Sequence, residues 1–220
     1  MVKPPVIDGL RTVYLPASRP PEGGAEAEKL IVVLHGLGDS VEGYRFLPQV
    51  MEMPEASWLL VNAPDPYFTG YSWFDIYGDM APGIIRSRKL LTSLLGQLRG
   101  QGRKPENIAL FGFSQGCVMV TDTALRYAHA LAGVVGISGF VFLEFPEALP
   151  PAAQEQKFLF THGTMDSMID SQVTRRQVEA LREMGIRAEW AEFPKDHTID
   201  PREEIPLIRH FLREALSLDR

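Results

Sequence analysis

The sequence predicts a single α/β domain with a mostly parallel, doubly wound sheet flanked by helices. Short apolar runs rich in β-branched residues alternate with longer segments of helical periodicity, which is the order that a parallel sheet with crossover helices requires. The length of 220 residues suffices for one sizeable core, and no internal repeat or second composition regime divides it. We therefore expect one domain over residues 1–220.

The expected strands follow in chain order. Residues 1–28 are rich in Pro, Gly and Glu, and they contain one strand at 12–15 ahead of an exposed loop. Five apolar runs then predict strands within the sheet, at 30–34, 58–61, 108–113, 133–137 and 158–161. The final run, 188–193, alternates apolar and polar residues and predicts an edge strand.

The helices are expected between these strands. Apolar spacing and helix-end residues predict helices at 42–51, 84–99, 118–126 and 172–184. Pro48 should break or kink the first helix. Gly100 and Gly102 end the second, and Gly185 is the C-cap of the fourth. An aromatic-rich loop is expected at 66–75, and an irregular Pro-rich segment at 144–153.

The last helix has a recognisable start signal. Asp200 is the expected N-cap, with Pro201 at the first helical position and Glu203 at the third. Pro206 cannot continue the hydrogen-bond ladder of a helix that starts there. We therefore expect a kink or a restart at Pro206.

Composition and charge exclude several classes of function. The chain is 45% hydrophobic and 23% charged, as in soluble globular proteins, and its net charge of −6 offers no broad basic surface for nucleic acid or anionic lipid. No N-terminal apolar segment has signal-peptide length, and no apolar run is long enough for stable membrane insertion, so a cytoplasmic location is expected. The single cysteine, Cys117, excludes an intramolecular disulfide framework.

The segment Gly112-Phe113-Ser114-Gln115-Gly116 has the pattern of a nucleophile elbow. An apolar strand precedes it and a helix follows it directly. In such a turn the serine takes a strained backbone conformation that raises its hydroxyl above the sheet edge. The two glycines allow strand and helix to approach closely. Ser114 is therefore the candidate nucleophile.

A serine nucleophile needs a base and an acid that orients the base. Asp166 lies beyond the 158–161 strand and His197 beyond the 188–193 strand, at the same expected sheet edge as Ser114. The chain order Ser, Asp, His is the one expected of an α/β-hydrolase. The segment 35–38, His-Gly-Leu-Gly, follows the 30–34 strand and reaches the same edge.

Several residues compete for these roles. Asp170 is an alternative to Asp166, because a loop beyond the same strand carries both carboxylates. We interpret His35 as a residue that shapes its turn, and His162 as a hydrogen-bonded strand-end residue. His129 and His210 lie in predicted helical contexts and are interpreted as surface groups. Cys117 should face the packing side of its helix rather than a substrate. No His or Cys pair has metal-ligand spacing, so neither a metal nor a cofactor is expected.

Together these motifs resemble the phospholipase/carboxylesterase branch of the α/β-hydrolases, which includes the acyl-protein thioesterases. The resemblance covers roughly residues 28–215 and rests on the following segments: 34–39, Trp73-Phe74-Asp75, the elbow at 112–116, and His162-Gly163-x-x-Asp166 with the late His197. It implies an α/β-hydrolase fold with Ser114 as nucleophile, His197 as general base and acid, and Asp166 as orienting carboxylate. It also implies an oxyanion hole formed by the backbone N–H groups of Leu37 and Gln115. Members of this branch often form dimers, so the resemblance is also compatible with a homodimer of this chain.

Apolar residues gather in the loops expected around this edge, and among them Trp73 and Met168 are predicted to line an acyl pocket. We therefore expect a serine carboxylesterase that cleaves small-molecule carboxylic esters of short to medium acyl chains through an acyl-enzyme. One alternative is a thioesterase acting on acylated proteins, or a lysophospholipase. A second alternative, of another class, is a non-catalytic binding module that keeps the hydrolase fold.

Overall fold

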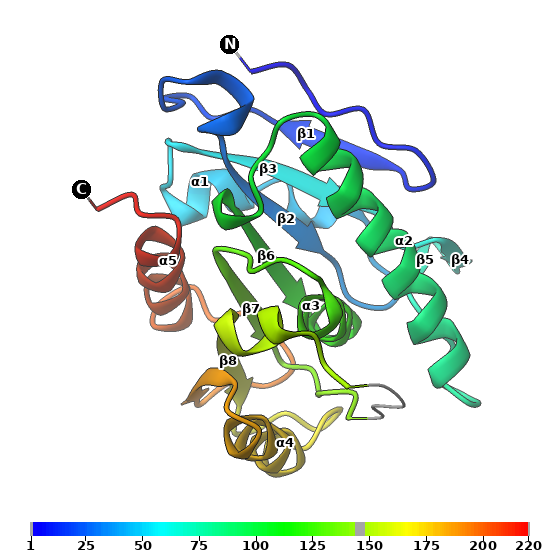
Figure 1. Ribbon diagram of the computed structural model, residues 1–220. Helices are drawn as coiled ribbons and strands as arrows, with labels where there is room; N and C mark the ends of the chain where they lie inside the picture. The colour runs from blue at the N-terminus through cyan, green and yellow to red at the C-terminus, as the bar shows by residue number, and fades with distance from the viewer. Residues whose placement is uncertain (1, 144–147, 220) are drawn as a thin grey trace.

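The computed structural model describes residues 2–143 and 148–219 of the chain. In this part of the chain a seven-stranded sheet forms the centre of the molecule, in the order β1-β3-β2-β6-β7-β8-β9 (Figure 1). Only β1 is antiparallel to its neighbour, and the remaining described pairs of this sheet are parallel. The strands are β1 (Thr12–Leu15), β2 (Lys29–Leu34), β3 (Ala56–Val61), β6 (Ile108–Phe113), β7 (Gly133–Ile137), β8 (Lys157–Gly163) and β9 (Arg187–Phe193).

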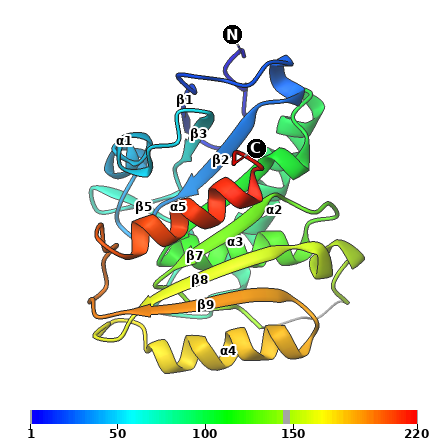
Figure 2. The ribbon, with the colours of Figure 1, turned by 90° about the vertical axis from the view of Figure 1, so that its left-hand side faces the viewer.

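Helices cover both faces of this sheet. Apolar residues of α2, α3 and α4 pack into the core on one face, and those of α1 and α5 pack into the core on the other (Figure 2). The helices are α1 (Leu47–Met51), α2 (Ala81–Gly100), α3 (Gln115–Arg126), α4 (Ser171–Glu183) and α5 (Glu204–Ala215). Short 3-10 turns lie at Gly24–Glu26, Val41–Tyr44, Pro105–Asn107 and Pro151–Glu155. This arrangement confirms the doubly wound α/β fold.

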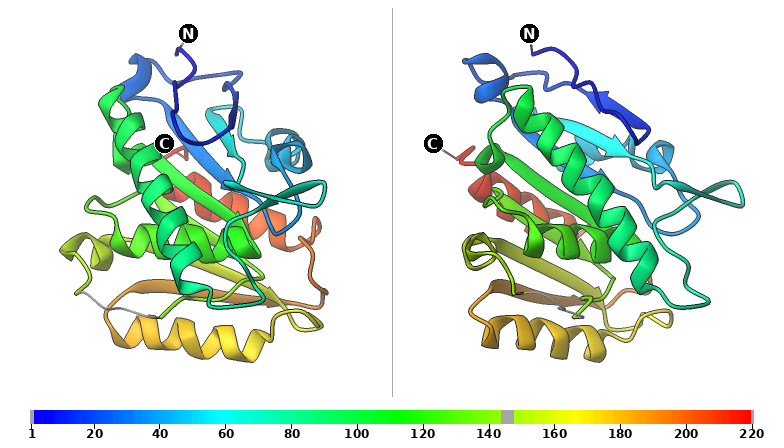
Figure 3. Two further views of the ribbon diagram at one scale, coloured as in Figure 1. Left: turned by 90° about the vertical axis from the view of Figure 1, so that its right-hand side faces the viewer. Right: turned by 45° about the vertical axis from the view of Figure 1, so that its right-hand side comes forward.

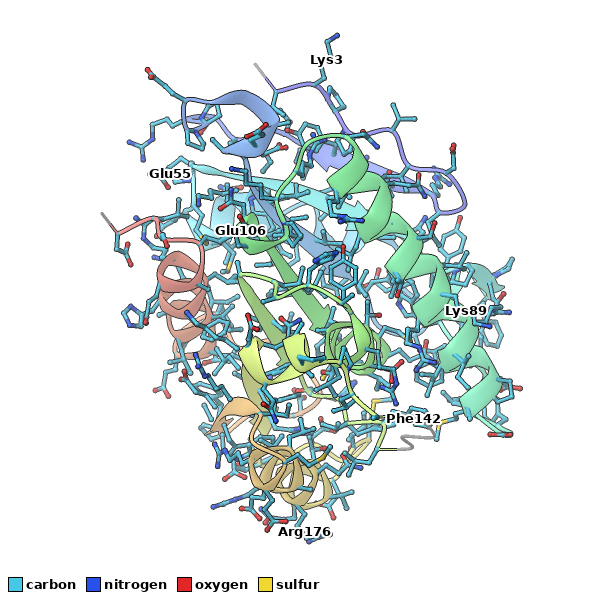
Figure 4. All side chains as sticks on the ribbon, in the orientation of Figure 1. Lys3, Glu55, Lys89, Glu106, Phe142 and Arg176 are labelled. Carbon is cyan, nitrogen blue, oxygen red and sulfur yellow. The ribbon has the colours of Figure 1, made fainter. Side chains whose placement is uncertain are left out.

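The helix surfaces divide between core and solvent. On α2, the apolar positions Ile84, Leu91 and Leu94 face the sheet and are buried. Lys89 of the same helix and Arg176 of α4 point outward (Figure 4). No helix in the described ranges combines the length and the apolar character that a bilayer span requires.

The predicted strands all occur. The helix expected at 42–51 is interrupted near Pro48, as predicted: a 3-10 turn comes first, and α1 then starts at Leu47 with Pro48 in its first turn. The segment 66–75 is not only a loop. Two three-residue strands, β4 (Asp65–Tyr67) and β5 (Gly70–Ser72), form a hairpin that projects from the body of the molecule (Figure 3). Part of the predicted irregular segment, residues 144–147, lies outside the described residues.

The last helix begins later than predicted. Asp200 accepts hydrogen bonds from the backbone N–H groups of Arg202 and Glu203, and so caps a separate turn. The helix α5 starts only at Glu204 and continues to Ala215. Pro206 therefore lies in its first turn, where backbone N–H groups have no intrahelical acceptor. The expected N-cap at Asp200 is corrected, since Glu203 is the N-cap of α5, and of the two alternatives expected near Pro206 the structure shows a restart, at Glu204.

The sheet order creates a switch point between β2 and β6. The chain extends from β2 outward to β3 in one direction, and from β6 through β7 and β8 to β9 in the other. Loops that leave the carboxyl ends of two such strands diverge and leave room between them. The loop after β2 and the turn after β6 are therefore the places where a binding site is expected.

Candidate active site

Ser114 occupies the turn between β6 and α3 in a strained conformation. Its φ of 55° and ψ of −117° lie outside the regions that non-glycine residues favour. A Cβ atom at Gly116 would overlap the carbonyl oxygen of Leu34, and one at Gly112 would overlap that of Gly116. The close contact between β2, β6 and α3 thus requires both glycines and holds Ser114 at the end of the sheet.

A hydrogen-bonded chain links Ser114 to two residues from other strand ends. The Ser114 hydroxyl donates to Nε2 of His197 at 2.9 Å. Nδ1–H of His197 donates to Oδ2 of Asp166 at 2.7 Å, which fixes the neutral imidazole in the tautomer that leaves Nε2 free to accept. The structure thus brings together the three side chains that the sequence singled out.

The Asp166 carboxylate is buried and fully paired. Backbone N–H groups of Met168 and Ile169 donate to its Oδ1, both at 2.9 Å. Burial alone would raise the pKa of Asp166, but the hydrogen bonds from Ile169, His197 and Met168 outweigh burial and hold the pKa below its usual value. Asp166 is therefore ionised at neutral pH and can stabilise a positively charged imidazole.

The alternative carboxylate has another function. Asp170 is the N-cap of α4, and its side chain accepts a hydrogen bond from the Gln172 N–H at 2.9 Å. It lies four residues beyond Asp166, and its carboxylate is directed to the start of α4. Of the two carboxylates, Asp166 is therefore the one that is hydrogen-bonded to His197 in this structure.

His35 and His162 both have structural hydrogen bonds. His35 is buried, donates from Nδ1 to the Gly36 carbonyl at 2.6 Å, and accepts the Ala63 N–H at Nε2. Nε2–H of His162 donates to the Ile169 carbonyl at 3.0 Å, within the turn that carries Asp166. Burial lowers the pKa of both imidazoles, so both remain neutral at pH 7.

The two remaining histidines lie away from this cluster. His210 is exposed on α5, as expected. His129 is not helical, because α3 ends at Arg126, and its ring lies against that of Tyr127. Cys117 is fully buried, and burial raises the pKa of its thiol to about 12, so it carries no thiolate at neutral pH.

The loop after β2 passes directly beside Ser114. A Cβ atom added to Gly36 would come within 3.3 Å of the Ser114 Cβ. Gly38 N–H donates to the Tyr71 carbonyl at 2.9 Å, which joins this loop to strand β5. Gln115 is the first residue of α3, so its backbone N–H has no acceptor within the helix. Leu37 and Gln115 thus lie on the two loops of the switch point.

The side chain of Gln115 has a role that the sequence did not reveal. Its Oε1 accepts the Trp73 N–H at 2.9 Å, and its Nε2–H donates to the Phe74 carbonyl at 2.8 Å. The elbow is thereby attached to the segment after β5. The sequence shows only a glutamine directly after the candidate nucleophile, and neither its burial nor its partners follow from its position.

Trp73 does not line a pocket in this structure, which corrects the prediction. Its side chain is completely buried, and the indole N–H donates to the His35 carbonyl at 2.9 Å. The ring therefore supports the loop after β2 from inside the core. Met168 is 72% exposed beside the Asp166 turn and is available to a substrate.

A groove lies against the loop after β2. Its volume is about 150 Å³, and its lining includes Leu37, Tyr67, Phe74 and Ile76. Larger hollows, of about 410 and 570 Å³, lie against other elements, at the start of β8 and β9 and beside α2. None of the residues that line the groove or these two hollows belongs to the hydrogen-bonded chain of Ser114, His197 and Asp166.

Comparisons with known proteins agree with this geometry. A model of the family described as phospholipase/carboxylesterase matches residues 21–216. Acyl-protein thioesterase 1 of Schizosaccharomyces pombe is 34% identical over 166 residues, which cover 69% of this chain and 74% of that protein. Carboxylesterase SOBER1 of Arabidopsis thaliana is 29% identical over 215 residues, covering 87% of this chain and 92% of that protein.

Solved structures show the same fold. The crystal structure of Arabidopsis thaliana SOBER1 aligns with a TM-score of 0.76 and 26% identity, over 86% of this chain and 99% of that one. The crystal structure of esterase PE8 aligns with a TM-score of 0.76 and 27% identity, over 94% of this chain and 99% of that one.

Proposed function

Because the chain belongs to the phospholipase/carboxylesterase family of α/β-hydrolases, we propose that it is a serine carboxylesterase with Ser114 as its nucleophile. The observation that carries this proposal is the hydrogen-bonded chain from Ser114 through His197 to Asp166. A free serine hydroxyl is a poor nucleophile at neutral pH, and an adjacent base with a fixed tautomer removes this limitation. No other part of the described chain offers such an arrangement around a strained serine.

The proposed reaction has two halves. Ser114 Oγ attacks the carbonyl carbon of the ester while His197 Nε2 takes its proton, and His197 then returns that proton to the leaving alcohol. Water attacks the resulting acyl-enzyme, again with His197 as base, and releases the acid and free Ser114. Asp166 stays ionised throughout and stabilises the imidazolium.

The developing oxyanion needs hydrogen-bond donors. We assign this role to the backbone N–H groups of Leu37 and Gln115. Gly36 places the first loop against Ser114, and the start of α3 leaves the second N–H without a helical acceptor. The positive end of the α3 dipole adds to the stabilisation of negative charge at this position.

The proposed preference for short to medium acyl chains rests on the groove lined by Leu37, whose backbone N–H we assign to the oxyanion hole. This groove has a volume of about 150 Å³, whereas pockets for drug-sized ligands usually hold about 300–1,000 Å³. Met168 is exposed next to Asp166 and is the proposed contact for the rest of the substrate.

An acyl-protein thioesterase or lysophospholipase is the second candidate. The specific observation in its favour is the identity of 34% with a protein named acyl-protein thioesterase 1. A palmitoyl thioester that is hydrolysed with a higher kcat/KM than the butyryl and octanoyl thioesters of the same thiol would favour this candidate. A higher kcat/KM for the two shorter acyl chains would favour the carboxylesterase. A cytoplasmic location and a homodimeric state remain predictions.

Labelling with a fluorophosphonate tests the proposal directly. Such a probe phosphonylates only a serine that a base activates, so we expect one label per chain at Ser114, identified by peptide mass spectrometry. The Ser114→Ala variant is the control and should stay unlabelled. A folded wild-type protein that is neither labelled nor active on aryl esters would contradict the proposed esterase activity. It would favour the alternative of a non-catalytic binding module.

A further inference from the structure

A buried ammonium group lies underneath the loop that carries His197. Lys195 is only 6% exposed, two residues before His197. Its Nζ donates to the Thr198 carbonyl at 2.6 Å and to the Ser138 hydroxyl at 3.2 Å, and it forms an ion pair with the Glu204 carboxylate at 2.7 Å. The three oxygen atoms match the number of donors of an ammonium group, and all three belong to the protein.

These partners come from three different parts of the fold. Thr198 directly follows His197, Glu204 is the first residue of α5, and Ser138 follows β7 at the sheet edge. The residue before Ser138, Ile137, accepts the backbone N–H of Ser114 at 2.9 Å. The Lys195 ammonium thus connects the histidine loop to the end of the sheet next to the nucleophile.

The main chain of Lys195 makes a second connection, toward Asp166. Its carbonyl accepts the Met165 N–H at 3.1 Å. A Cβ atom at Gly163 would overlap this same carbonyl, so the two loops are in close contact. Residues 195–198 form a loop with His197 at its centre. The Lys195 carbonyl fixes this loop to the Asp166 turn, and the hydrogen bond from Nζ to Thr198 closes it.

Burying the charged groups of Lys195 and Glu204 carries a desolvation penalty. Glu204 is also completely buried, and its second carboxylate oxygen accepts the Asp200 N–H at 2.8 Å. Burial lowers the pKa of Lys195, and the Glu204 carboxylate opposes this effect. Apolar residues of similar volume often stabilise a fold as well as a buried ion pair does. The stability of the fold therefore does not by itself explain why an ion pair occupies this position.

We propose that Lys195 is a positioning residue, whose ammonium group closes the loop 195–198 and holds the His197 imidazole within reach of Ser114. The inference rests on the proposed function, since it assigns His197 the role of base. Lys195 itself touches no reacting atom. Its removal should lower the rate of the chemical step rather than the affinity for substrate, because a displacement of about 1 Å of a catalytic group can cost about 100-fold in rate.

The test compares the variant Lys195→Met with the double variant Lys195→Met/Glu204→Gln. The single variant leaves the Glu204 charge buried without its partner, so its melting temperature should fall. The double variant removes both charges at similar volume, and its melting temperature should return toward that of the wild type. In both variants kcat for an aryl ester and the rate of fluorophosphonate labelling should fall about 10- to 100-fold, with KM changed less than about threefold. The backbone amides of 196–198 should exchange with deuterium faster in both.

Two further variants complete the experiment. Lys195→Arg keeps a donor for the Thr198 carbonyl and should recover part of kcat. Lys89→Met makes the same lysine-to-methionine substitution at an exposed lysine of α2, far from the loop 195–198 in the sequence, and should retain kcat. A double variant that regains wild-type kcat together with its melting temperature would overturn the inference alone, since the ion pair would then be structural. A folded wild type that is never labelled would overturn the proposed function, and the positioning role with it.

Discussion

Nε2 of His197 and Oγ of Ser114 lie 2.9 Å apart, although 83 positions separate the two residues in the sequence. The strands that precede them, β9 and β6, are not neighbours, because β7 and β8 lie between them in the sheet. Their contact arises because parallel strands end at the same edge and the loops there turn toward one another. The geometry of the site thus depends on the order of the strands in the sheet. Substitutions both near to and far from Ser114 should therefore affect activity or stability.

The first prediction concerns the two carboxylates after β8. Asp166→Asn should lower kcat by about 10⁴-fold, because an amide at this position favours the wrong imidazole tautomer. Asp170→Asn is the matched control. Asparagine also caps helices well, so this variant should keep both its kcat and its stability. Aryl ester hydrolysis at pH 7 measures kcat for the two variants. An equal loss of kcat in both would contradict the assignment of Asp166.

The second prediction separates a core residue from a surface residue near the site. Trp73→Ala should lower the free energy of unfolding by about 3–5 kcal/mol, because it empties a large buried volume. Met168→Ala should leave stability within about 0.5 kcal/mol but change the relative kcat/KM for butyryl and octanoyl esters. Urea denaturation and a chain-length series provide the measurements. A stable Trp73→Ala variant with an altered chain-length preference would restore the pocket assignment of Trp73.

The third prediction uses two glycines in helices. At Gly116 an added methyl group would overlap the Leu34 carbonyl oxygen, so Gly116→Ala must push α3 away from β2 and should cost more than about 3 kcal/mol. At Gly96, on the exposed face of α2, the added methyl group would meet no atom within 4 Å apart from the adjoining backbone of its own helix. Gly96→Ala should therefore stabilise the protein by about 0.5–1 kcal/mol. Urea denaturation measures the change in the free energy of unfolding for each variant. Changes of opposite sign would support the close packing of the elbow.

The features of the site that the sequence predicted share one property. Ser114, Asp166 and His197 each follow an apolar run that is easily recognised as a strand, and the parallel order of the sheet brings their loops together. The glycines at 112 and 116 could be interpreted in the same way, because their steric role depends on neighbours close in sequence or on the adjacent strand.

Features that depend on distant partners could not be predicted. An aromatic residue at a loop position suggests a pocket wall, but the partner of the Trp73 indole is a backbone carbonyl that no pattern reveals. The ion pair of Lys195 and Glu204 joins two segments that look like exposed loop and helix start. Strands as short as β4 and β5 contain too few residues for an alternation signal.

The last prediction concerns the acid side of the stability curve. The pKa of Asp166 in the folded protein lies below its usual value, which the unfolded chain is expected to show. Between these two pKa values the unfolded state binds more protons than the folded state, so the free energy of unfolding rises with pH. The stabilisation from Asp166 is therefore complete above the pKa that this carboxyl has in the unfolded chain, about 4. It is lost as the pH falls through the lower pKa of the folded state.

Asp166→Asn removes this proton-linked contribution while keeping the side-chain volume. The difference in free energy of unfolding between wild type and variant should thus be largest at pH 6–7 and should shrink as the pH is lowered from about 5 toward 3. Urea denaturation at four pH values measures this difference, with Asp170→Asn as the control for removing a carboxylate from the same loop. A difference that stays constant across this range would mean that the hydrogen bonds from Ile169, Met168 and His197 do not favour the ionised form of Asp166.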